Sequence, residues 1–86
     1  MPDTTELLQR GIALAKAGRH EEARDLLLQV IEQDERNESA WLWVSGVVDN
    51  DDDRAIALEN VLAINPNNEW AKRGLTILGR PLPNVG

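Results

Sequence analysis

Apolar residues recur three or four positions apart along most of this chain, and short polar stretches separate the runs. Leu7, Gly11 and Leu14 show this spacing near the start, and a longer run extends from His20 to Asp34. Such spacing places apolar side chains on one face of an α-helix. The pattern predicts an all-α fold of five helices, followed by an extended tail over residues 80–86.

Helix-capping residues mark the ends of these runs. Asp3, with Glu6 three residues later, resembles a capping box, and Gly18 is expected to end the first helix. Asn37 can cap the third helix, and Asn67 or Asn68 the fifth.

An acidic run, Asp49 to Asp53, separates the third and fourth helices. We expect its last Asp residues to cap the fourth helix, which should end before Pro66. The alternating Asp residues also resemble the start of a calcium loop, which needs a glycine next and a glutamate at its twelfth position. Arg54 and Asn60 occupy those places, so a capped turn is favoured and no metal or cofactor is expected.

One pattern occurs twice in the chain. Leu7 and Trp41 open equivalent runs 34 residues apart, whereas Val30 and Val61 are equivalent at a distance of 31 residues. The difference predicts that the inner turn of the second copy is three residues shorter. A period of about 20–50 residues is typical of repeat arrays, in which units bury their apolar faces by stacking. The segment from Trp41 to Val48 suits a strand by composition, but its register with the first helix favours a helix.

The residues at key positions resemble the tetratricopeptide-repeat (TPR) family. That family has a large apolar residue early in its first helix, a small residue one turn later, a glycine at the inner turn, an alanine early in its second helix and a proline after it. The matching residues are Leu7, Gly11, Gly18 and Ala23 in the first copy, and Trp41, Ser45 and Pro66 in the second. The chain departs from the pattern at two places. Glu35 stands where the first proline is expected, and Arg54 falls near where the second alanine is expected.

The resemblance implies a short right-handed α-solenoid of antiparallel helix pairs over residues 3–79. Its first repeat would cover about residues 4–37, its second about 38–68, and a capping helix about 68–78. The first helix of each pair would line a concave binding wall. The inward residues would be Thr5, Leu8, Gln9, Ile12, Leu42, Trp43, Gly46, Trp70, Arg73 and Ile77.

Composition excludes several classes of function. The 86 residues carry a net charge of −6, which disfavours nucleic acid, and contain no cysteine. One histidine and no glycine-rich phosphate loop give no catalytic constellation, so we expect no enzyme. No apolar run is long enough for a membrane span, and the start lacks a signal peptide, so a cytoplasmic protein is expected.

Three hypotheses remain for the function. The first is a protein interaction module that binds an apolar peptide or helix through Trp43 and Trp70, since tryptophan is enriched in binding hot spots. The second is a self-association element that forms a homodimer. The third is a terminal fragment of a longer repeat array. The tail or a second copy could also cover the two tryptophans.

Overall fold

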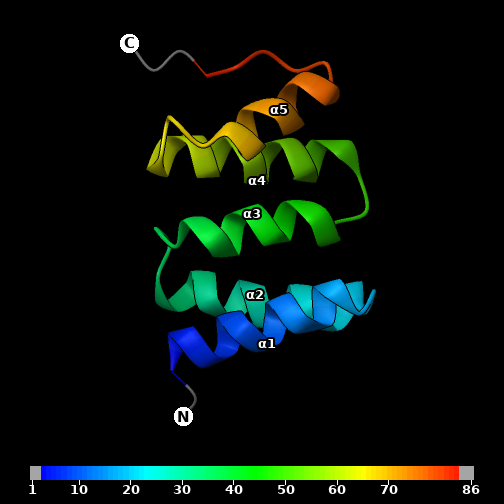
Figure 1. The fold of residues 1–86 in the computed structure, drawn as a ribbon, viewed down its shortest axis with the longest axis vertical. Coiled ribbons are helices and arrows are strands. Elements are labelled where there is room, and N and C mark those ends of the chain that lie inside the picture. The colour runs from blue at the N-terminus through cyan, green and yellow to red at the C-terminus, as the bar shows by residue number, and fades with distance from the viewer. Residues whose placement is uncertain (1–2, 84–86) are drawn as a thin grey trace.

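The computed structural model describes residues 3–83, which form five α-helices joined by short turns (Figure 1). The helices are α1 (Thr4–Lys16), α2 (His20–Gln33), α3 (Glu38–Val47), α4 (Asp51–Ile64) and α5 (Glu69–Ile77). Every regular element of this range is a helix, which confirms the all-α prediction, including the strand-like segment that begins at Trp41. The end of the expected tail, residues 84–86, lies outside the described residues.

Adjacent helices pack on one another in chain order. Contacts join α1 to α2, α2 to α3, α3 to α4 and α4 to α5, and α1 also touches α3. The helices lie across the long axis of a body of 39 × 24 × 17 Å, with α1 and α5 at opposite ends (Figure 1). This packing of neighbouring helix pairs is consistent with a helical repeat.

Three expected N-caps are present. Asp3, Asn37 and Asn68 each accept a hydrogen bond from the backbone N–H three residues ahead, at 2.8–3.0 Å. The predicted cap of α4 is wrong, because Asn50 accepts the bond from the Asp53 N–H at 2.8 Å. Asp51 to Asp53 instead form the first turn of α4, where their negative charges interact favourably with the helix dipole.

Glycines end the first and last helices. Gly18 and Gly79 follow α1 and α5 with φ angles of 79° and 73°, a left-handed conformation that costs glycine little. The prediction of a shorter inner turn in the second copy is wrong. The turns 17–19 and 48–50 have equal length, and α3 is the shorter element, with 10 residues against 13 in α1.

Small residues allow the helices of the first pair to approach closely. A Cβ atom built on Gly11 would lie 2.9 Å from Cδ2 of Leu27, and Ala23 is fully buried beside them. Side chains longer than these would hold α1 and α2 apart. The two small residues singled out in the first copy therefore lie where the pair is in contact.

Trp41 fixes the position of α3. Its indole ring is half-buried and packs against two core clusters, which contain Leu27 and Leu58 respectively. Its Nε1–H donates a hydrogen bond of 2.9 Å to the carbonyl oxygen of Glu35. Trp41 thus lies against the core, as its register with Leu7 predicts.

Candidate binding groove

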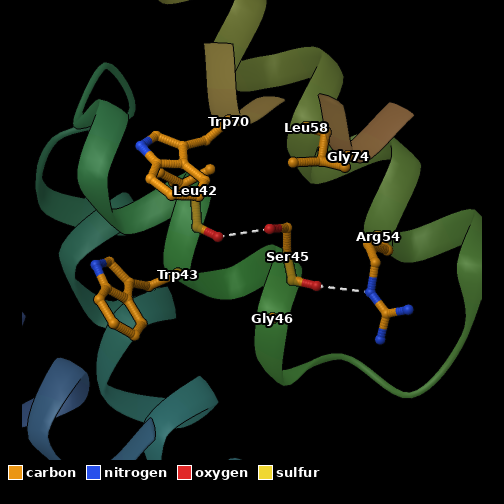
Figure 2. A pocket seen from close by; sticks show the side chains of 8 residues that line it. All are labelled: Leu42, Trp43, Ser45, Gly46, Arg54, Leu58, Trp70 and Gly74. Atoms are coloured by element: carbon orange, nitrogen blue, oxygen red, sulfur yellow. Dashed lines mark hydrogen bonds between the residues drawn. The ribbon is translucent and has the colours of Figure 1, made fainter. Parts of the chain in front are cut away.

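A pocket of about 780 Å³ lies between α3, α4 and α5 (Figure 2). Its lining is mostly apolar and consists of Leu42, Trp43, Ser45, Gly46, Arg54, Leu58, Trp70 and Gly74. Figure 2 shows the two tryptophans and Leu42 on one side and Arg54 on the other. The volume is within the range of about 300–1,000 Å³ typical of ligand pockets.

The two tryptophans of the pocket differ in exposure. Trp70 has 69% of its surface exposed, although tryptophan is usually among the more buried residues. Trp43 is half-buried and also contacts the core cluster that contains Ala23 and Leu27. An exposed indole beside a pocket leaves apolar surface in water, which a bound apolar group would cover.

A cation accompanies each of the two rings. The Nζ atom of Lys16 lies 5.9 Å from the ring centroid of Trp43, and Cζ of Arg73 lies 5.7 Å from that of Trp70. Both distances are within the reach of a cation–π interaction, which contributes about 0.5–1 kcal/mol at exposed sites. The cations are therefore held beside the aromatic surface of the pocket.

Arg54 ties the end of α3 to the start of α4. Its Nε–H donates to the carbonyl oxygen of Ser45 at 2.8 Å and an Nη2–H to that of Val48 at 3.2 Å (Figure 2 draws the first bond). Another guanidinium nitrogen lies 3.4 Å from the carboxylate of Asp51. No glycine ends α3, so this side chain binds the carbonyls left unpaired at the helix end. The departure from the repeat pattern at Arg54 thus has a structural role.

Two glycines shape the pocket in opposite ways. A Cβ atom on Gly74 would lie 2.7 Å from Cδ1 of Leu58, so α4 and α5 are in close contact there. A Cβ atom on Gly46 would meet nothing within 4 Å, because that position faces the open space of the pocket. A larger residue at Gly46 would enter the pocket without disturbing the core.

The α4–α5 turn is fastened to the start of α3. The side-chain amides of Asn65 and Asn68 donate hydrogen bonds to Oε2 of Glu38 at 2.9 and 2.6 Å. Both bonds stabilise the carboxylate, and the bond from Asn68 has the larger effect. They lower the pKa of Glu38 below its ordinary value of 4.5. Because Asn68 also caps α5, the network positions Trp70 opposite α3.

Four of the residues expected on the concave wall line the pocket, namely Leu42, Trp43, Gly46 and Trp70. Arg73 stacks on the Trp70 ring, and Ile77 lies seven residues after Trp70 on α5 with 77% of its surface exposed.

The four expected residues of α1 lie outside this pocket. Thr5 and Gln9 are exposed, Leu8 packs against two core clusters, and Ile12 is half-buried. Their role in binding stays a prediction. The described part of the tail, residues 80–83, does not line the pocket either, and Arg80 pairs with Asp52 at the start of α4.

Four lining residues were not among those expected: Ser45, Arg54, Leu58 and Gly74. In the repeat pattern Ser45 is the small residue one turn after Trp41, and Arg54 is a departure. Leu58 and Gly74 carry no such sequence signal, because their contact depends on how α4 and α5 pack.

No group of three His, Asp or Glu side chains within residues 3–83 could hold a metal ion. No described helix is long and apolar enough to cross a membrane. His20, which opens α2, is exposed.

The chain was compared with protein-family models, with curated proteins and with solved structures, and no match was found in any of the three comparisons.

Proposed function

We propose that this chain is a cytoplasmic protein interaction module without catalytic activity, which binds an apolar peptide or helix in the groove between α3 and α5. The observation that carries the proposal is the exposure of Trp70, 69% of whose surface is in contact with solvent beside an apolar pocket. Aromatic anchors in such pockets contribute much of the affinity in many protein complexes. An amphipathic helix lying in an apolar groove is a common mode of recognition.

The proposed architecture is a short right-handed α-solenoid similar to the TPR family. Equivalent details of the two repeats support it. Asn37 and Asn68, 31 residues apart, cap the helices that open successive units. Their side-chain oxygens accept equivalent hydrogen bonds, from the backbone N–H groups of Ala40 and Ala71. In such a solenoid α1, α3 and α5 would lie on the concave side, and α3 and α5 contribute six of the eight residues that line the pocket.

Selection of peptides from a random library displayed on phage would test the proposal. Wild-type protein is expected to enrich peptides rich in apolar residues. Trp70→Ala should weaken their binding by about 2 kcal/mol or more, because the anchor surface is lost. Gly46→Met should weaken binding as well, because the added side chain occupies the pocket.

Matched variants outside the pocket control for general effects. Ile56→Ala truncates a side chain on α4 that is 53% exposed, and Ala63→Met adds one at an exposed position of the same helix. Both should bind the selected peptides like wild type. Peptides that bind all five proteins equally, or a selection without enrichment, would contradict the proposed groove.

Self-association is a second candidate, favoured by the exposed apolar surface of α5. Trp70 and Ile77 are the two most exposed large apolar residues of the described chain, and both lie on this helix. A homodimer through α5 would appear as a doubled mass in light scattering at high protein concentration. Ile77→Lys should return the mass to that of a monomer, and a monomeric wild type would exclude this candidate.

A further inference from the structure

The lining of the groove differs in charge from the chain as a whole. Fifteen acidic and nine basic residues give a net charge of −6, yet none of the eight residues that line the pocket is acidic. The cations Lys16 and Arg73 lie beside its two tryptophan rings, and Arg54 lies at its far side. The groove is therefore an apolar surface with basic borders on an acidic molecule.

Lys16 and Arg73 are not neutralised by carboxylates of the described residues. Within residues 3–83, the ion pairs involve Arg19, Arg24, Arg54, Lys72 and Arg80 only. Both Lys16 and Arg73 are exposed, and neither donates a hydrogen bond to another described residue. Their N–H groups can therefore bind a ligand while the rings hold the side chains in place.

We propose that the occupant of the groove is an amphipathic peptide segment whose apolar residues cover Trp43 and Trp70 and whose flanking Asp or Glu residues pair with Lys16 and Arg73. This inference rests on the proposed function and specifies the chemistry of the partner. Charge complementarity of this kind favours correct partners and disfavours basic ones at the same groove.

The net charge of the chain does not oppose this pairing at close range. At physiological ionic strength, charges separated by more than about 8 Å are largely screened, so the carboxylates on remote faces act weakly on the ligand. Lys16 and Arg73, which lie beside the groove, would contact the ligand directly. An exposed ion pair of this type changes affinity by about 1.5- to 5-fold.

Three synthetic peptides of about twelve residues form the probe, a length sufficient for a short amphipathic helix. They share the same Leu and Phe residues and differ only in flanking residues, which are Glu, Gln or Lys. Tryptophan emission of the protein, to which Trp43 and Trp70 of the groove contribute, reports binding, because the peptides contain no tryptophan. We expect the Glu peptide to bind tightest and the Lys peptide weakest, and the difference to shrink as salt is added.

Neutral variants identify the cations involved. Lys16→Gln and Arg73→Gln should each lower the affinity for the Glu peptide about 1.5- to 5-fold and leave the affinity for the Gln peptide unchanged. Arg36→Gln is the control, because Arg36 is exposed in the α2–α3 turn and does not border the pocket. The Gln peptide also reports whether loss of the cation has moved a tryptophan, since its affinity would then fall too.

The possible results separate the two proposals. Equal affinity for the three peptides, tighter binding of the Lys peptide, or an equal effect of Lys16→Gln on all three would overturn the acidic partner and leave an apolar groove. Failure of every peptide to bind wild type would overturn the proposed function itself.

Discussion

Leu75 is the residue on which the attachment of α5 depends most. It is fully buried in the cluster that also contains Leu58, Val61 and Leu62. Only Ala71 and Leu75 of α5 are buried, and α4 is the only helix of the described chain against which α5 packs extensively. Replacing Leu75 with alanine would therefore remove most of the apolar contact that holds α5 in place.

The expected cost can be set against the stability of the whole chain. Truncating a buried leucine to alanine costs about 2–5 kcal/mol. Domains have about 0.05–0.15 kcal/mol of stability per residue, or roughly 4–13 kcal/mol for a chain of this length. A helix of nine residues is unstable alone. We expect Leu75→Ala to release and unfold α5 while α1 to α4 stay folded.

Hydrogen exchange of backbone amides measures this directly. In Leu75→Ala, the amides of α5 should exchange much faster than in wild type, whereas those of α2 should keep most of their protection. Leu28→Ala is the matched control, because the same truncation at a side chain that is 41% exposed should cost less than about 1 kcal/mol. If α5 and α2 lose protection together in Leu75→Ala, the helices form one cooperative unit and the reasoning from neighbour contacts is wrong.

Three further predictions concern stability. Gly46→Ala should raise the free energy of unfolding by up to about 1 kcal/mol in urea titrations, because the added Cβ meets no atom and glycine disfavours helices; a loss of stability would contradict the open position. Ala23→Leu should cost about 1–3 kcal/mol, since Ala23 is fully buried where α1 and α2 touch, and an unchanged melting temperature would refute that contact. The lowered pKa of Glu38 stabilises the fold above the unfolded-state pKa near 4.5, and this contribution is lost as pH falls through the folded-state value. The stability difference between wild type and Glu38→Gln should therefore be largest at neutral pH and shrink at pH about 3, and a constant difference across urea titrations at both pH values would contradict it.

The sequence by itself determined the helices and most of their ends. Caps such as Asn37 and the left-handed Gly18 act on backbone groups within a few residues, so their effect can be predicted without knowledge of the neighbours. The repeat register also placed Trp41 against the core and the tryptophans of the groove, Trp43 and Trp70, at positions that line one pocket. Helical periodicity assigns each residue to a face of its own helix, and the resemblance to the repeat family supplied the face on which Trp43 and Trp70 were expected.

Only the tertiary structure decided what those faces meet. It showed that α3 is shorter by three residues while the turns are equal, that Arg54 binds carbonyl oxygens at the end of α3, and that Leu58 packs against Gly74. The cation beside Trp43 comes from Lys16, 27 residues earlier in the chain. These contacts join residues far apart in sequence, and their geometry depends on the distance and angle between packed helices, which local patterns of apolar and polar residues do not specify.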